Sequence, residues 1–222
     1  MTEEPTDDGH EHAHDDHGHD SEHARDDHGH DSEHAHDDHH HHDIHELGVA
    51  VLTVSSSRNI DEDAAGDAII EIVTEAGHEM SVRELVRDDY DKVQGAVNRL
   101  VGRGDTDCVI TTGGTGVTPD DVTIEAVESL FEKHLPGFGE LFRTLSYDEI
   151  GTKIVGTRAV AGVADGVPVF CLPGSENAVR LGTEEIIVEE APHLAGLAKR
   201  EEEAEDAEEG EDAEEGENND GE

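Results

Sequence analysis

The sequence is poor in basic and aromatic residues. Its 222 residues include 14 Lys and Arg against 58 Asp and Glu, which gives a formal net charge of −44. A charge of this sign argues against a general electrostatic attraction to nucleic acid or to an anionic membrane. Aromatic residues make up 3% of the chain and Trp is absent. Taken as one unit, a chain this charged and poor in apolar residues would pack badly.

Long apolar runs and cysteines are also scarce. The chain contains no run of 18 or more apolar residues, so we expect no membrane-spanning helix. The N-terminus lacks the apolar segment of a secretory signal, and we therefore expect a cytoplasmic protein. Cys108 and Cys171 are the only cysteines, and both lie in apolar, strand-like runs. We expect buried, unpaired thiols rather than a disulfide or a metal pair.

The acidic residues are concentrated at the two ends of the chain. Residues 1–45 hold 16 acidic residues, one basic residue and 15 of the 18 histidines, whereas residues 201–222 hold 14 acidic residues and no basic one. Residues 46–200 carry 28 acidic and 13 basic residues, an ordinary balance for a globular domain. The sequence therefore predicts one folded domain, 46–200, between two disordered acidic tails, 1–45 and 201–222.

Both tails are repetitive. The first repeats the decapeptide DDHGHDSEHA, and the second repeats the hexapeptide EDAEEG. Dense His with Asp suits a transition metal such as Zn²⁺ or Ni²⁺. Two interpretations of the His-rich tail stay open: a metal-buffering or metal-sensing arm, and a solvating segment that binds metal only incidentally. The acid excess, with four Lys in 46–200, also predicts adaptation to high intracellular salt, which screens self-repulsion.

Strand-like and helix-like segments alternate through the central region. Apolar runs of strand length occur at 48–55, 107–112 and 167–172, and 78–86 is predicted as a strand from its inward residues Met80 and Val82, with Leu85 as a further inward candidate. A further strand or hairpin is predicted at 158–163. Helical apolar spacing occurs at 63–76, 89–103, 119–133, 138–150 and 176–189. This alternation predicts a three-layer α/β fold, with a mostly parallel sheet and helices on both faces. Ligands bind such sheets beyond the carboxyl ends of the strands.

Two glycine-containing turns follow predicted strands at this edge. Gly113-Gly114-Thr115-Gly116 precedes a helix in which Thr118 is the predicted cap and Pro119 the first residue. Glycine permits close backbone approach and a helix N-terminus offers N–H groups, so the loop is either a phosphate cradle or a tight turn. Pro173-Gly174-Ser175 repeats the arrangement, either as a binding turn or as a plain strand-to-helix turn capped by Ser175.

Three carboxylates also lie at or near this edge: Asp88, Asp121 and Glu125. Asp121 and Glu125 are four residues apart and are predicted to share one helix face. Carboxylates beside a phosphate site repel the ligand unless Mg²⁺ lies between them, which makes a Mg²⁺-nucleotide a natural occupant. The alternative is that Asp121 only begins the helix and Glu125 lies on a solvated face.

Three stretches carry a specific family pattern: TTGGTGVTPDDVTIEAV at 111–127, LPGFGELFRTLSYDEIGTKIVGTRAVAGVADG at 135–166 and FCLPGSENAV at 170–179. They resemble the MoaB/Mog family of molybdenum cofactor biosynthesis proteins, and the resemblance covers about 47–190. It implies a molybdopterin-binding α/β domain, assembled as a homotrimer or homohexamer, that acts with other proteins of this biosynthesis. It also implies a Mg²⁺-dependent reaction in which molybdopterin and ATP give adenylyl-molybdopterin and pyrophosphate.

The resemblance further implies roles for individual residues. The loop from Gly113 to Gly116 would hold phosphate. Asp88, Asp121 and Glu125 would be the catalytic residues, with Asp121 and Glu125 as Mg²⁺ ligands. The other substrate-binding positions would be Ser55, Ser56, Ser146, Pro173, Gly174 and Ser175.

Two residues depart from the family pattern. Ser56 stands where many adenylyltransferases of the family have Asp, and Asp120 stands where the family often has Arg. The implied enzyme is a molybdopterin adenylyltransferase. The alternatives are a non-catalytic molybdopterin-binding or carrier protein of the same fold, and a related domain with other nucleotide chemistry.

Overall fold

The computed structural model describes residues 43–57 and 59–199. The His-rich and EDAEEG repeats lie outside these residues, and with them the hypothesis of a metal-binding tail. Within the described part, no helix is both long and apolar enough to cross a membrane.

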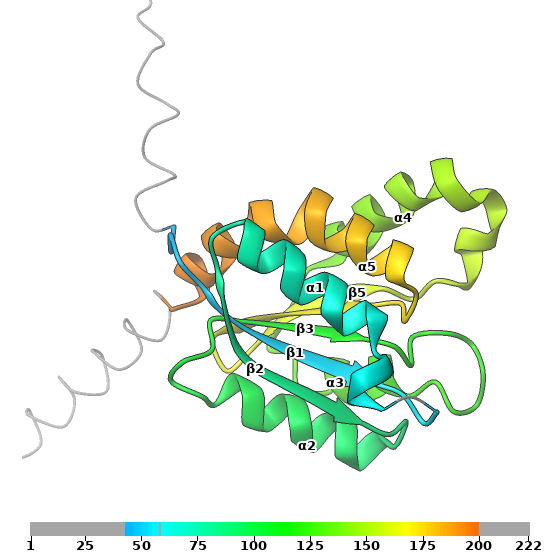
Figure 1. Cartoon of the computed structure of the whole chain (residues 1–222), viewed down its shortest axis with the longest axis horizontal. Helices are drawn as coiled ribbons and strands as arrows, with labels where there is room; N and C mark the ends of the chain where they lie inside the picture. Colours follow the sequence, from blue (N-terminus) through cyan, green and yellow to red (C-terminus); the bar gives the residue numbers. More distant parts are fainter. Residues whose placement is uncertain (1–42, 58, 200–222) are drawn as a thin grey trace, which may run out of the picture. The chain divides into compact units, whose positions relative to one another are not determined.

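The described residues form one six-stranded sheet in the order β2-β1-β3-β6-β5-β4 (Figure 1). Four strands are parallel: β1 (Gly48–Val54), β2 (Glu79–Val86), β3 (Cys108–Thr112) and β6 (Val167–Leu172). Two are antiparallel to their neighbours: β5 (Val160–Ala164) and β4 (Lys133–His134). The predicted mostly parallel sheet is therefore confirmed. The inner strand β3 is buried along its whole length, which is why its sequence is continuously apolar in the middle.

Helices cover both faces of the sheet (Figure 1). One face carries α1 (Ala64–Glu75), α4 (Pro136–Ile150) and α5 (Glu176–Gly182). The other carries α2 (Tyr90–Val101) and α3 (Thr123–Glu128). The 3₁₀ turns are η1 (Ile60–Glu62) and η2 (Gly151–Gly156). Each face buries its own apolar cluster, so the three-layer fold is confirmed.

Two predicted helices have different bounds in the structure. The segment 119–133 contains only the six-residue α3, whose N-cap is Val122 and not Thr118. The chain makes a turn before the helix instead, because the Asp121 carboxylate accepts hydrogen bonds from the Thr118 N–H (2.8 Å) and hydroxyl (2.6 Å). The helix predicted at 176–189 continues through a π-helical turn, η3 (Thr183–Ile187), and residues 188–199 are helical as well.

Both cysteines are fully buried and unpaired, as predicted. Burial raises the pKa of the Cys171 thiol to about 12, and it raises the pKa of Cys108 as well. Neither thiol is therefore ionised at neutral pH, which fits a packing role.

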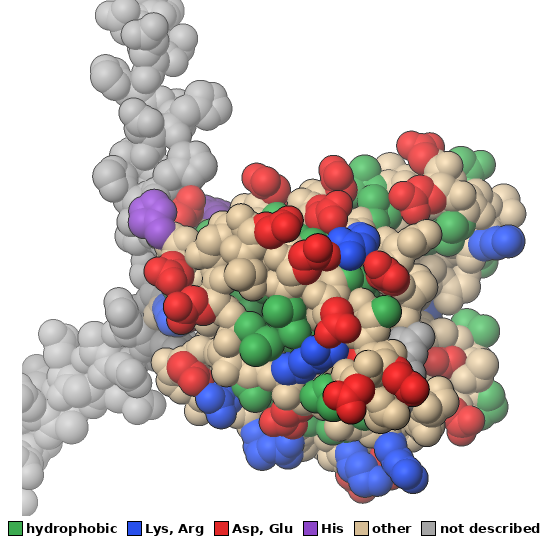
Figure 2. All heavy atoms as spheres, in the orientation of Figure 1, with side chains coloured by type: hydrophobic (Ala, Val, Ile, Leu, Met, Phe, Trp, Pro, Cys, Tyr) green, Lys and Arg blue, Asp and Glu red, His purple; other side chains and the backbone are tan. Residues whose placement is uncertain are grey.

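Most charged side chains of the described residues lie on the surface. Figure 2 shows acidic side chains spread over this face of the domain. Some form exposed ion pairs, such as Arg103 with Asp105 (2.7 Å) and Arg180 with Glu71 (2.7 Å). Exposed pairs contribute only about 0–1 kcal/mol each and are screened by salt. We therefore attribute most of the stability to the two apolar clusters.

A buried aspartate, Asp63, connects helix α1 to the strands β1 and β2. Asp63 is 0% exposed and caps α1 by accepting a hydrogen bond from the Gly66 N–H at 3.1 Å. Thr53 of β1 and Arg83 of β2 donate to the same carboxylate at 2.6 and 3.1 Å. Burial alone would raise the pKa of Asp63, but the hydrogen bonds and the Arg83 charge outweigh it and lower the pKa below its ordinary value.

We expect Asp63→Asn to lower the free energy of unfolding by about 2–4 kcal/mol at pH 7, because it removes the buried one of two carboxylates that pair with Arg83 and weakens the cap of α1. Asp67→Asn is the matched control. Asp67 also binds Arg83 (2.6 Å), but its side chain is 63% exposed. Its loss should therefore cost less than about 1 kcal/mol. Equilibrium denaturation in urea measures both values.

The stabilisation by Asp63 should depend on pH in a defined direction. Because the folded-state pKa of Asp63 is lowered, its contribution is fully present above the ordinary value of 3.8 and is lost as the pH falls through the lowered value. The stability difference between the wild type and Asp63→Asn should therefore shrink on acidification below about pH 4. A difference that stays constant down to acid unfolding would contradict this assignment.

Candidate functional site

A cleft of about 630 Å³ lies at the carboxyl ends of β1, β3 and β6. This is the edge at which open parallel sheets bind ligands. Of the ten predicted substrate-binding residues, the cleft is lined by Ser55, Ser56, Gly113, Gly114, Thr115, Gly116, Pro173, Gly174 and Ser175. Asp88, Asp120 and Asp121 line it as well. The structure thus brings together segments that are far apart in the sequence.

Two glycine turns meet backbone to backbone beside the cleft. Gly113 has φ +97°, and a Cβ at this position would overlap the carbonyl oxygen of Val54. A Cβ on Gly174 would lie 3.2 Å from the Cα of Gly113. The Gly113 N–H donates to the carbonyl of Leu172 at 3.1 Å, which fastens the first turn to the end of β6. Both the positive φ and the lack of space require glycine at position 113.

The second glycine of the loop brings Asp88 and α3 close together. Gly114 has φ +62°, and a Cβ there would overlap Thr123 and lie 3.1 Å from Oδ1 of Asp88. Thr123 donates its N–H to the Gly114 carbonyl at 3.0 Å. The Asp88 N–H donates to the hydroxyl of Ser56 at 3.3 Å. The loops after β1, β2 and β3 are therefore in mutual contact, and Asp88 stands among them.

Asp121 is a carboxylate in the cleft wall. Its Oδ2 atom accepts both hydrogen bonds from Thr118. Partial burial pushes its pKa up, but the hydrogen bonds from Thr118 and Gly116 and the charge of Arg158 outweigh burial and lower the pKa below its ordinary value. Asp121 is therefore an anion at neutral pH.

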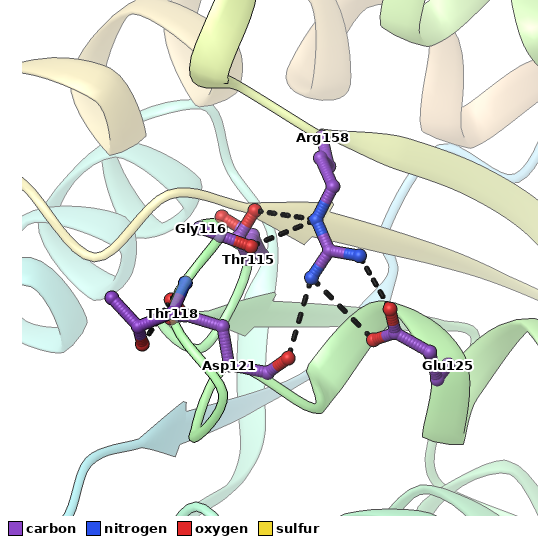
Figure 3. Close-up of polar contacts among 6 residues, drawn as sticks. All are labelled: Thr115, Gly116, Thr118, Asp121, Glu125 and Arg158. Atoms are coloured by element: carbon purple, nitrogen blue, oxygen red, sulfur yellow. Dashed lines mark hydrogen bonds and ion pairs between the residues drawn. The ribbon is translucent and has the colours of Figure 1, made fainter.

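Glu125 is not among the residues that line the cleft, but it lies near Asp121, as its spacing of four residues predicted. Its carboxylate accepts hydrogen bonds from both terminal nitrogens of Arg158 (Figure 3). The hydrogen bond from Arg158, opposed by slight burial, lowers the pKa of Glu125. Glu125 and Arg158 line a neighbouring hollow together with Asp121, which lines the cleft as well.

Arg158 is the residue that the sequence analysis missed. Its Nε donates to the carbonyl of Gly116 at 2.8 Å and, more weakly, to that of Thr115 at 3.4 Å. Its Nη2 also donates to the Asp121 carbonyl at 3.3 Å. The sequence placed Arg158 only at the start of a strand or hairpin. No local pattern could link it to a loop 37 to 43 residues earlier in the chain.

Ser146, the tenth predicted position, lies beside the cleft rather than in it. It is buried on α4 and lines an adjoining cavity of about 300 Å³ with apolar side chains that include Phe142 and Ile154. Thr157, Pro173 and Ser175 line both spaces, so the cavity and the cleft share a wall.

The cleft is acidic. Its charged side chains are Asp88, Asp120 and Asp121, and no Lys, Arg or His of the described residues lines it. In the same part of the chain, no group of three or more His, Cys, Asp or Glu side chains is arranged to hold a metal ion. A divalent ion in this cleft would therefore take most of its oxygen ligands from bound phosphates and water, as Mg²⁺ commonly does.

The chain matches known proteins through this domain. Residues 50–193 match the sequence profile of the family described as "Probable molybdopterin binding domain". Molybdenum cofactor biosynthesis protein B of Bacillus subtilis is 46% identical over 147 residues, which cover 65% of this chain and 85% of that protein. The protein of the same name from Escherichia coli K12 is 40% identical over 146 residues, covering 66% and 84%.

Solved structures agree with this match. A crystal structure of molybdenum cofactor biosynthesis protein B superposes with a TM-score of 0.68 at 41% identity, covering 70% of this chain and 97% of that one. The tungsten cofactor synthesizing protein MoaB from Pyrococcus furiosus gives 0.63 at 41% identity, covering 69% and 97%. All the segments that line the cleft lie within the matched residues 50–193. The chain belongs to the MoaB/Mog family of molybdenum cofactor biosynthesis proteins.

Proposed function

We propose that the cleft is the active site of a molybdopterin adenylyltransferase, which uses ATP to convert molybdopterin into adenylyl-molybdopterin and pyrophosphate. Family membership places the chain in molybdenum cofactor biosynthesis and supports molybdopterin as its ligand. The observation that carries the proposal is the convergence of both glycine turns with Asp88 and Asp121 in one cleft.

The reaction needs no nucleophile from the protein. A phosphate oxygen of molybdopterin attacks the α-phosphorus of ATP, and a new P–O bond forms there. The bond from this phosphorus to the oxygen bridging to the β-phosphate breaks, and pyrophosphate leaves with both electrons. Aligning the two phosphates and offsetting their charge are then the main tasks of the site. The glycine turns suit the first task, because the positive φ and close packing of Gly113 and Gly114 hold the loop backbone at the edge of the cleft.

Mg²⁺ enters the cleft as part of the substrate, as Mg²⁺-ATP. Asp88 and Asp121 have the carboxylate oxygens that Mg²⁺ prefers, and Asp121 is ionised at neutral pH. Bound between them and the phosphates, the ion would neutralise charge that these aspartates alone would repel. We assign Glu125 to its partner Arg158 instead of to Mg²⁺, because its carboxylate is already bound there.

Molybdopterin fits the space beside the nucleotide. The adjoining cavity has apolar walls at Phe142 and Ile154 for a ring system and the hydroxyl of Ser146 for a polar contact. Its shared wall with the cleft would direct the phosphate of molybdopterin toward the glycine turns. We also propose a homotrimer or homohexamer, supported by large exposed apolar side chains on α4 and η2: Leu141, Tyr147, Ile150 and Val155.

A non-catalytic molybdopterin carrier is the second candidate. Ser56 and Asp120, the two departures from the family pattern, both line the cleft. Ser56 lacks a carboxylate that many adenylyltransferases of the family have, and Asp120 replaces a cation with an anion. Either change would weaken binding of the triphosphate while leaving the adjoining cavity intact.

We expect Asp121→Asn to lower adenylylation about 100-fold, the effect of losing one preorganised electrostatic group. The assay combines purified protein in high-salt buffer with molybdopterin, Mg²⁺ and α-labelled ATP, and measures adenylyl-molybdopterin and pyrophosphate. Asp165→Asn is the control, because Asp165 is exposed in the β5–β6 turn and its positive φ of 51° is tolerated by Asn. Full turnover in Asp121→Asn, with both variants folded, would remove Asp121 from the active site.

The rate of product formation in Ser56→Asp distinguishes the adenylyltransferase from the non-catalytic carrier. If the missing carboxylate limits the transfer, the variant should form product faster than the wild type, because the added charge would help to hold Mg²⁺-ATP. Asn98→Asp is the control, since it adds the same charge at an exposed position of α2 that does not line the cleft. Molybdopterin binding without product in the wild type and in Ser56→Asp alike would favour the carrier.

A further inference from the structure

The loop that contributes more cleft residues than any other segment has little regular structure of its own. Residues 113–122 connect β3 to α3 without helix or strand. Part of the loop is held by internal contacts: the Asp121 N–H donates to the Thr118 carbonyl at 3.0 Å, and the Asp121 carboxylate binds Thr118. Such contacts shape a local turn, but they do not set where that turn sits relative to the sheet.

Arg158 connects the loop to the rest of the domain. Three of its acceptors are backbone carbonyls of Thr115, Gly116 and Asp121, which are spread along the loop (Figure 3). Arg158 itself stands just before β5, directly after Thr157, which lines both the cleft and the adjoining cavity. The Arg158 side chain, which precedes β5, therefore binds the segment 115–121 near both of its ends.

The chemistry of this contact requires an arginine. A guanidinium has five N–H donors in a rigid plane, so it can bind carbonyls from one side and a carboxylate from another at the same time. Glu125, on α3, takes both terminal nitrogens of Arg158 and thereby orients the plane. A lysine in the same place would keep the charge but could not reproduce this fork.

We propose that Arg158 is a positioning residue for the transfer reaction, which holds the loop 115–121 in place and is itself oriented by Glu125. Its effect on turnover rests on the proposed function; its effect on the loop does not. Arg158 is not among the residues that line the cleft. It sets the position of the Gly114–Gly116 backbone and of Asp121 relative to the turn at Pro173. A displacement of about 1 Å in such a site can cost about 100-fold in rate.

The test compares Arg158→Gln, Arg158→Lys and Glu125→Gln with the control Arg99→Gln. Arg99 also pairs with a glutamate and a backbone carbonyl, Glu84 at 3.0 Å and Gly95 at 2.9 Å, but on α2. The first readout is hydrogen exchange of the amides in 113–122, which is independent of activity. We expect exchange at least about tenfold faster in the three site variants, with wild-type rates in Arg99→Gln and similar melting temperatures throughout.

The second readout is steady-state kinetics in the adenylylation assay. We expect kcat to fall about 100-fold in Arg158→Gln and to recover little in Arg158→Lys, while the KM for molybdopterin stays near the wild-type value. The Mg²⁺ concentration for half-maximal rate should be the same in Glu125→Gln as in Arg158→Gln. Wild-type exchange in Arg158→Gln would overturn the proposal.

Glu125→Gln separates this proposal from direct metal binding. A raised Mg²⁺ requirement in Glu125→Gln alone, with loop exchange unchanged, would make Glu125 a metal ligand and would also overturn the proposal. A wild-type protein that forms no product would refute the proposed function instead. The exchange measurement would still decide whether Arg158 holds the loop.

Discussion

The close approach of two glycine turns is the constraint on which the site depends. Gly113 packs against the end of β1 with no room for a side chain, and Gly174 packs tightly against Gly113. These contacts are available because β1, β3 and β6 are parallel neighbours, so that the loops after them leave the sheet at one edge. A Cβ at Gly113 would push the loop away from the end of β1 and change the shape of the cleft.

Charge is the second organising feature. The cleft places three aspartates together without a basic side chain among the described lining residues, while Arg158 stands behind the loop with its guanidinium turned to carbonyls and to Glu125. Under the proposed function, these carboxylates would face the Mg²⁺ that enters with ATP. This arrangement suits chemistry in which the substrate supplies its own metal and the protein supplies position.

Much of the fold was predictable because it rests on local patterns. Three of the parallel strands, β1, β3 and β6, are mainly apolar runs of the right length. Gly77 (φ 90°) follows the end of α1, and Ser175 caps the start of α5, as their residue types predict. The start of α3 was predicted wrongly, because the string Thr118-Pro119 has the residue types of a helix start. Hydrogen bonds from the N–H and hydroxyl of Thr118 to the Asp121 carboxylate make a turn there instead, and sequence patterns do not distinguish a helix start from this turn.

The sequence by itself determined the alternation of strands and helices, the edge of the sheet at which the cleft lies, and most of the residues that line the cleft. Each follows from local spacing or from the rule that parallel strands end at one edge. Only the tertiary structure decided which carboxylates face the cleft, and it placed Glu125 on Arg158 and Ser146 in the adjoining cavity. The physical reason is that a side chain's partner depends on contacts between distant segments, and Arg158 meets its loop across about forty residues of chain.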